Sequence, residues 1–352
     1  KVDIANPDTK EYERTARELR SYYISELEHD SRFQDLFRYN GINMLEILHN
    51  EMKQLLGKDY ITLGSDAAYF QEVLQKTKPD ILIVGCEATT VNWSHVLLAK
   101  SKGIPILEVQ HGIFTHLTLI FPPISDKCAV GGEYYKETYL NGGAKTDQVI
   151  VTGWPKLDSL MDQPNKDISK TRKEILFATQ PIDLDLNLKV IETIGTCFDP
   201  LKGVHLIVKP HPREDPNAYT EICAPFKSVI LCSNQENTSS LVASADVLIT
   251  ISSTVAIEAI LLDKPIVCLN MSNDESIYVS SGVALNVTNY QDIVPAIKDV
   301  LYNDEILENL ADARKVFIYQ HTYHRDGKAS KRVADLAISM IEDNKRGRII
   351  ST

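Results

Sequence analysis

Apolar residues recur every three or four positions through the first part of the chain, and this spacing predicts helices. The clearest examples are residues 12–28 and 43–56, each of which would bury one apolar face. No run of alternating or consecutive β-branched residues stands out there. We therefore expect a helical segment over residues 1–79 that contains no strand.

From Asp80 the pattern changes to short runs rich in Ile and Val, each followed by a turn and a stretch of helical period. This alternation is typical of a parallel sheet whose strands are joined by crossover helices. It predicts a first doubly wound α/β domain over residues 80–158. The predicted strands of this domain are 81–85, 106–110, 127–130 and 149–152.

A polar stretch at residues 162–167 predicts a linker. Beyond it, a second series of apolar runs predicts another doubly wound domain over 168–320, followed by a C-terminal helix over 321–352. The predicted strands are 175–178, 205–209, 228–232, 246–250, 265–269 and 283–285, and the predicted helices are 186–196, 239–244, 255–262, 293–302, 305–319 and 328–344.

Composition narrows the class of protein. The chain has 352 residues, 43% of them hydrophobic and 24% charged, which suits about two globular domains. Its net charge of −11 opposes sequence-independent binding of nucleic acid. No apolar run approaches the roughly 18 residues of a membrane-spanning helix. We expect a cytoplasmic protein, with peripheral membrane contact left open through the short basic tail at 345–348.

The six cysteines contain no C-x-x-C pair, and Cys86, Cys232 and Cys268 end apolar strand-like runs. Free cysteines of this kind are usually buried in proteins of a reducing compartment. We therefore predict six buried thiols and no disulfide framework.

Ligands of open α/β sheets bind beyond the carboxyl ends of the strands, so the residues that directly follow strands are the first candidates. His111 follows a predicted strand, and an imidazole that titrates near neutrality can take a proton from a hydroxyl. The alternative is that His111 only caps the strand through a backbone hydrogen bond. Gln110 and Gly112 beside it, and Asp66 and His116 further away, are weaker candidates.

A second candidate site follows the predicted strand 205–209, where prolines hold a Lys, a His and an Arg close together. Three donors in a rigid loop suit a phosphate or diphosphate, although a proline-rich turn with solvated charges is the alternative. The donors and their proline are Lys209, His211, Pro212 and Arg213, and Thr179 and Gln180 are weaker candidates for the same site.

A third candidate follows the predicted strand 246–250. Ser252, Ser253 and Thr254 occupy the N-cap region of the predicted helix 255–262, where free N–H groups favour an anion. Glu258 lies one turn further on and could accept hydrogen bonds from a ribose. The alternative is that the three hydroxyl residues only cap the helix.

The remaining motifs carry less chemistry. We expect the polar turn at 323–332 to cap the last helix, with completion of a phosphate pocket as the alternative. Asp183 and Asp185 have the spacing of a metal-binding D-x-D, but they lie in a polar turn that we expect at the surface. No metal-ligand cluster is evident, which favours a metal-independent mechanism. The absence of G-x-x-x-x-G-K-[ST], G-x-G-x-x-G and G-x-S-x-G argues against NTPase, dinucleotide oxidoreductase and hydrolase functions.

Taken together, these motifs resemble the GT-B superfamily of sugar-nucleotide enzymes over about residues 80–340. More narrowly, they resemble surface-polysaccharide transferases: capsule Kdo transferases, CDP-glycerol glycerophosphotransferases, and bacterial sialyltransferases with HP and SS motifs. The C-terminal half is also similar to UDP-N-acetylglucosamine 2-epimerases. The segments that carry the resemblance are 110–112, 152–158, 209–212, 245–258 and 326–330.

The resemblance implies a GT-B-like α/β fold: two Rossmann-like doubly wound domains that face each other across a cleft, with a C-terminal helix that crosses back to the first. It also implies that the second domain holds the nucleotide. His211, Ser252 and Ser253 would contact the donor phosphate, Glu258 the ribose, and His111 the acceptor as a base.

The leading hypothesis is a metal-independent glycosyltransferase that moves a sugar or glycerol-phosphate from a CMP-, CDP- or UDP-linked donor to a surface glycan, free or lipid-linked. Lys209, His211 and Arg213 would stabilise the leaving phosphate. The nucleotide-sugar is a substrate, so no cofactor is expected. The first alternative is a UDP-N-acetylhexosamine 2-epimerase, which needs no acceptor, and the second is a non-catalytic GT-B-like binding subunit.

Overall fold

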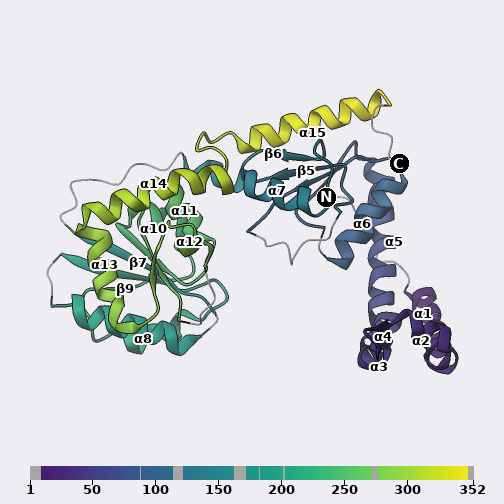
Figure 1. Ribbon diagram of the computed structural model, residues 1–352, viewed down its shortest axis with the longest axis horizontal. Coiled ribbons are helices and arrows are strands. Elements are labelled where there is room, and N and C mark those ends of the chain that lie inside the picture. The colour runs from purple at the N-terminus through teal and green to yellow at the C-terminus, as the bar shows by residue number, and fades with distance from the viewer. Residues whose placement is uncertain are drawn as a thin grey trace.

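The computed structural model describes residues 9–87, 89–113, 122–161, 172–181, 183–200, 203–271 and 276–347. The described chain forms a helical N-terminal arm and two parallel sheets with their helices, joined along one side by the last two helices (Figure 1). The expected α/β fold with two parallel sheets is confirmed. The predicted linker at 162–167 lies outside the described residues.

The N-terminal arm is helical, as predicted, except for one short hairpin. Strands β1 (Arg38–Tyr39) and β2 (Ile42–Asn43) pair antiparallel, so the expectation of no strand before residue 80 was wrong. Asn40 and Gly41 between them have φ of 48° and 81°, the backbone of a two-residue hairpin turn. The helices are α1 (Lys10–Ser25), α2 (Ser31–Leu36), α3 (Met44–Ile47), α4 (His49–Gln54) and α5 (Tyr60–Thr77), with a π-helical turn at Leu55–Asp59.

The N-terminal sheet has four parallel strands in the order β3-β4-β5-β6. Helix α6 (Thr90–Ser101) packs Val96 and Ala99 against Ile106 on one face of the sheet. Helix α7 (Glu133–Asn141) covers Cys128 and Val130. The strands are β3 (Leu82–Val84), β4 (Ile106–Val109), β5 (Lys127–Val130) and β6 (Val149–Val151).

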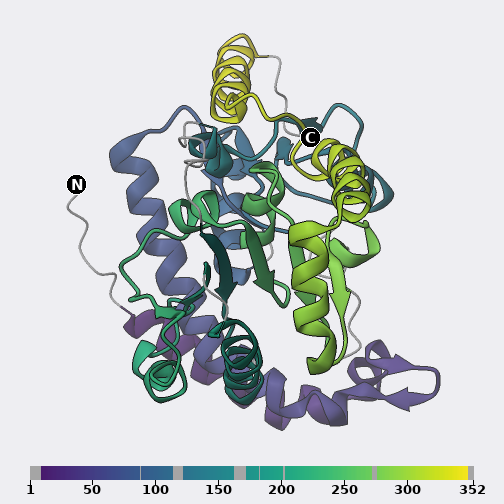
Figure 2. The same ribbon diagram turned by 90° about the vertical axis from the view of Figure 1, so that its left-hand side faces the viewer.

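The opposite face of the N-terminal sheet is covered by the end of the chain. Leu107 and Ala129 pack against Ala337 and Met340 of the last helix, α15 (Ala329–Lys345). The crossing helix that the resemblance implied is therefore present. Figure 2 shows α15 in yellow at one end of the molecule and the purple N-terminal helices at the other.

The C-terminal sheet has six parallel strands in the order β12-β11-β10-β7-β8-β9. The chain runs outward from β7 through β8 to β9 and then returns to β10, so the winding direction reverses between β7 and β10. Such a reversal is the topological switch point where open sheets bind ligands. The strands are β7 (Lys173–Ala178), β8 (Val204–Lys209), β9 (Val229–Leu231), β10 (Val247–Thr250), β11 (Ile266–Leu269) and β12 (Leu285–Val287).

Helices cover both faces of this sheet, because its strands are apolar on both sides. Phe177 and Ile249 point into a core shared with α8 (Leu184–Phe198) and α13 (Ile293–Tyr302). Neighbouring strand residues point into a second core with the helices on the other face. The remaining helices are α9 (Thr220–Cys223), α10 (Thr238–Ser244), α11 (Val255–Leu261), α12 (Ile277–Ser280) and α14 (Asp304–His321).

All six cysteines lie in the described part of the chain and none forms a disulfide, as expected, but the prediction that every thiol is buried was wrong. Cys86 is half-buried and Cys197 is exposed. Cys197 lies near the end of α8, outside the apolar stripe that faces the sheet. The other four, Cys128, Cys223, Cys232 and Cys268, are buried.

Candidate functional site

The side chain of Gln180 connects the carboxyl ends of the two strands at the switch point of the C-terminal sheet. Gln180 follows β7, and its Oε1 accepts a hydrogen bond from the backbone N–H of Ser252, beyond β10, at 2.7 Å. Its Nε2 lies 3.4 Å from the Ser252 hydroxyl. The structure thus brings together Gln180 and Ser252, which lie 72 positions apart.

The carboxylate of Glu214 holds the loop after β8 beside the end of β7. Its Oε2 accepts the backbone N–H of His211 at 2.9 Å and also the hydroxyl of Thr179. Its Oε1 accepts the hydroxyl of Tyr219 at 2.6 Å and lies 3.3 Å from Nδ2 of Asn187. One carboxylate therefore fixes the loop to the end of β7, to α8 and to the turn that follows.

The hydrogen bonds within this loop determine which of its donor groups are left to bind a ligand. The backbone N–H of Arg213 donates to Nδ1 of His211 at 3.1 Å, so the neutral ring carries its proton on Nε2, where it acts as a donor. Pro212 and Arg213 are exposed. Lys209 is only 4% exposed, and its ammonium donates to the carbonyl of Pro210 at 3.0 Å, so in this structure it supports the loop.

The serine-rich segment after β10 differs in detail from the sequence expectation. Thr254 stands at the N-cap position of α11, but its side chain caps no N–H group. Ser253 accepts from the backbone N–H of Val255 at 3.3 Å instead. Glu258 is half-buried, and its Oε2 accepts the hydroxyl of Ser239 at 2.7 Å.

In the N-terminal sheet, His111 forms the strand-capping hydrogen bond that was weighed as the alternative to a role as a base. Its Nδ1 lies 2.7 Å from the backbone carbonyl of Gly85. A carbonyl can only accept, so Nδ1 carries the proton and Nε2 of the exposed neutral ring keeps a free lone pair. His111 thus caps the strand end, and its role as a base stays a prediction. The tautomer is the opposite of that at His211.

Gln110 serves the backbone around this histidine. Its side chain is 7% exposed; Nε2 donates to the carbonyl of Gly112 and Oε1 accepts from the N–H of Gly131, both at 2.7 Å. Asp66 lies on α5, where its charge acts on His95 of α6, and no hydrogen bond or ion pair joins it to His111 within the described residues. His116 lies outside the described residues.

Two buried carboxylates beside this sheet were missed by the sequence argument. Glu108 is 5% exposed and accepts the hydroxyl of Tyr139 at 2.9 Å. Burial raises its pKa, as does the charge of Glu87. Glu87, 3% exposed, accepts backbone N–H groups of Ile124 and Ser125 at 2.8 and 2.6 Å. These hydrogen bonds hold the loop before β5. In the sequence, the only signal of this pair is that Glu108 stands inside an apolar run.

The polar turn before the last helix begins α15, as expected, but its cap comes from elsewhere. Asp158 accepts the backbone N–H groups of Ala329 and Ser330 at 3.0 and 2.7 Å. Arg325 forms two hydrogen bonds, of 2.9 and 2.8 Å, with Asp263.

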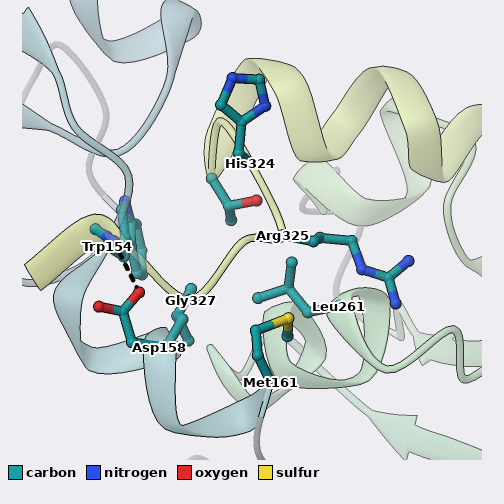
Figure 3. Close-up of a pocket in the computed structure, with 10 residues that line it drawn as sticks. Trp154, Asp158, Met161, Leu261, His324, Arg325 and Gly327 are labelled. Atoms are coloured by element: carbon teal, nitrogen blue, oxygen red, sulfur yellow. Dashed lines mark hydrogen bonds between the residues drawn. The ribbon is translucent and has the colours of Figure 1, made fainter. Parts of the chain in front are cut away.

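Figure 3 shows the pocket between the turn at Asp158 and the start of α15. Its volume is about 10 Å³, room for about one water molecule, so it holds no substrate.

Asp183 has the surface role predicted for it, because its side chain caps α8 by accepting the N–H of Leu186 at 3.1 Å. Within the described part of the chain, no three His, Cys, Asp or Glu side chains gather as metal ligands do. No helix among the described residues combines the length and apolar character needed to cross a membrane. The absence of a cofactor and the cytoplasmic location stay predictions.

The doubly wound C-terminal sheet, the N-terminal parallel sheet and the returning helix are the features of a GT-B-type α/β fold. The model of the UDP-N-acetylglucosamine 2-epimerase family matches residues 17–337. The chain therefore belongs to that family. The resemblance of its C-terminal half to these epimerases is confirmed, whereas the narrower resemblance to particular transferase families is not. Among curated protein sequences, none matches significantly.

Solved structures share the fold at low sequence identity. A putative UDP-N-acetylglucosamine 2-epimerase from Listeria monocytogenes has a TM-score of 0.63 and 18% identity, covering 81% of this chain and 80% of its own. The enzyme from Neisseria meningitidis has a TM-score of 0.59 and 19% identity over 93% and 97%. The wall teichoic acid polymerase TagF has a TM-score of 0.52 and 16% identity over 75% and 72%.

Proposed function

We propose that this protein is a UDP-N-acetylhexosamine 2-epimerase, which inverts the configuration at C2 of the sugar of a UDP-sugar substrate. The observation that carries the proposal is the loop at the switch point, within a chain whose family membership extends over residues 17–337. The Neisseria enzyme of similar fold was crystallised with UDP-N-acetylglucosamine, which supports the same substrate class here.

The loop suits the diphosphate of such a substrate. His211 presents Nε2–H, because Nδ1 accepts from Arg213, and the guanidinium of Arg213 adds a charge that pairs with phosphate oxygens. Ser252 adds an exposed hydroxyl across the switch point. We assign the diphosphate to these three side chains and keep Glu258 as the proposed partner of the ribose.

Inversion at C2 breaks a C2–H bond and forms a new one on the opposite face of the sugar. One group must therefore take up the departing proton, and the proton of the new bond is delivered from water to the opposite face. His111 is the candidate, because Nε2 of its neutral ring is a free acceptor and the Gly85 carbonyl fixes that tautomer. The buried Glu108, whose carboxylate is bonded to Tyr139, receives no such role.

The same histidine favours a glycosyltransferase as the second candidate function. Transfer to an acceptor hydroxyl needs a single base, and His111 alone would supply it. The fold shared with the TagF polymerase is compatible with this chemistry. In that case turnover would require an acceptor, whereas epimerisation would not.

The test is incubation of the protein with UDP-N-acetylglucosamine in D2O, followed by proton NMR of the sugar. We expect deuterium at C2 and a second UDP-sugar with inverted C2, without any acceptor. His211→Ala should lower kcat/KM about tenfold to hundredfold, since it removes a hydrogen bond to a charged group. The matched control is His205→Ala, at the opposite end of the same strand, which should leave kcat/KM unchanged.

Other outcomes separate the candidates. Nucleotide release that depends on an added glycan, with no deuterium at C2, would replace the epimerase by the transferase. Binding of UDP, detected as a rise in melting temperature, with no turnover of either kind would leave the non-catalytic subunit.

A further inference from the structure

The N-terminal arm contains a cavity that the proposed function does not use. It has a volume of about 440 Å³ and lies between α1 and the π-helical turn that leads into α5. Helix α1 contributes residues at spacings of three and four, which share one helical face. The lining residues are Glu13, Ala16, Arg17, Arg20, Gly57, Lys58, Ile61 and Thr62.

Three of these residues are cations, and their pairing differs from that of their neighbours. Arg17, Arg20 and Lys58 have no hydrogen bond or ion pair with any residue that the structure describes. Elsewhere on the same arm, four cations are paired with carboxylates. Arg14 pairs with Glu18, Arg32 with Asp30, Arg38 with Asp35 and Lys76 with Glu72.

The charge and shape of the cavity indicate what would occupy it. One carboxylate, Glu13, lines the cavity together with the three cations, which leaves an excess of two positive charges. Glu13 accepts a hydrogen bond from the hydroxyl of Thr9 at 3.0 Å. A Cβ added at Gly57 would lie 4.0 Å from Nη1 of Arg20, so this guanidinium reaches across to the π-helical turn. The lining therefore carries a positive formal charge in a protein whose net charge is −11.

We propose that this cavity, the N-terminal basic cavity, binds a phosphoryl or diphosphoryl group. A phosphate monoester carries about two negative charges at neutral pH and three strong acceptor oxygens, which match the excess charge and the fork-shaped guanidinium groups. Ala16 and Ile61 supply apolar surface beside the cations. Figure 1 places α1 and the start of α5 away from the C-terminal sheet, so this site is separate from the loop of His211.

The experiment must report on the cavity itself, because a phosphate can also bind the loop of the C-terminal sheet. The acetylation rate of Lys58, measured by peptide mass spectrometry on the full chain, gives a local signal. Lys78 is an exposed lysine at the end of α5, outside the cavity, and is the internal control. Saturating inorganic pyrophosphate should slow acetylation of Lys58 about tenfold, since a nearby anion favours the charged ammonium, and leave Lys78 unchanged.

Variants test whether the protection depends on the cavity. The double variant Arg17→Ala/Arg20→Ala changes two exposed side chains and should abolish the protection of Lys58. Arg14→Ala, on the same helix but paired with Glu18, should retain it. The protection should also weaken as salt is raised from low to physiological concentration.

A second arm distinguishes a dissolved ligand from a lipid headgroup. Phosphatidylcholine vesicles with phosphatidic acid replace the pyrophosphate, with vesicles of phosphatidylcholine alone as control. Protection by pyrophosphate supports a soluble phosphorylated ligand, and protection by the acidic vesicles alone supports a membrane phosphate. Unchanged acetylation of Lys58 in both arms, or equal protection in the double variant, would overturn the proposal.

Discussion

The two sheets of this protein are covered in different ways. The C-terminal sheet carries helices on both faces, and all of them come from the same part of the chain as its strands. The N-terminal sheet has α6 and α7 on one face. Its other face, with Leu107 and Ala129, is covered by Ala337 and Met340 at the far end of the chain.

The two halves of the proposed site therefore lie on sheets that are covered in different ways. The loop of His211 rests on a sheet whose own helices cover both faces, although the core on one face continues to Tyr135 and Trp154 of the N-terminal half. His111 rests on a sheet that depends on α15. The position of α15 in turn depends on the junction with α14, where Gly132 meets the backbone of Gln320 and Asp158 caps α15. Changes at this junction should therefore affect the N-terminal sheet first.

The largest effect is expected from Gly132→Ala. An added Cβ would lie 2.1 Å from the carbonyl oxygen of Gln320 and 2.7 Å from the backbone nitrogen of His321. Backbone cannot rotate away as a side chain can, so α14 must shift, and we expect a loss of more than about 3 kcal/mol. Urea unfolding followed by circular dichroism measures it.

Gly57→Ala is the matched control for that substitution. Its added Cβ would meet one flexible side chain at 4.0 Å, so the free energy of unfolding should change by no more than about 1 kcal/mol. An unchanged urea midpoint for Gly132→Ala would show that α14 does not depend on this contact.

The second prediction concerns pH and the same junction. His321, at the end of α14, is 5% exposed, with ring centroids of Phe317 and Tyr134 at 4.2 and 4.8 Å. Burial lowers its pKa to about 4. The unfolded chain, with its histidine pKa near 6.5, binds the proton more readily, so stability is complete above about pH 6.5 and falls as the pH drops toward 4.

The expected loss is about 2.5 kcal/mol at pH 4.5 relative to pH 7. Carboxylates titrate in the same range, so the measured quantity is the difference between the wild-type protein and His321→Phe. Thermal unfolding from pH 4.5 to 7.5 provides both curves. If the two proteins lose stability in parallel, His321 does not titrate as its burial requires.

Much of the fold could be predicted from the sequence because parallel strands that are buried on both faces are continuous apolar runs. The strand predicted at 127–130 has these bounds in the structure. The hairpin at 38–43 was not predicted because its strands have only two residues each and form no apolar run. Its one local signal is the Asn-Gly pair of a two-residue turn. The crossing of α15 came from the family resemblance, since no local pattern says which sheet a terminal helix covers.

The candidate site was predictable only in part, because the sequence shows which residues follow a strand but not which residues meet after folding. Candidate donors such as His211 and Ser252 directly follow strands and can be found in the sequence. Glu214 acts through hydrogen bonds to three separate elements, and that convergence exists only after folding. The tautomers of His111 and His211 likewise depend on backbone partners that no motif specifies.

The smallest of the three effects is expected from Asp158→Ala, which removes the carboxylate that accepts the N–H groups of Ala329 and Ser330. Loss of a helix cap costs about 1 to 2 kcal/mol, and here it should loosen α15 from the N-terminal sheet. Hydrogen exchange should rise in the strands that α15 covers more than in the C-terminal sheet.

The control is Asp335→Ala, which removes an exposed ion pair with Lys331 on the same helix and should change stability by less than about 0.5 kcal/mol. Equal exchange in both sheets would mean that the N-terminal sheet does not need the end of the chain, and the contrast between the two sheets would then be one of sequence order alone.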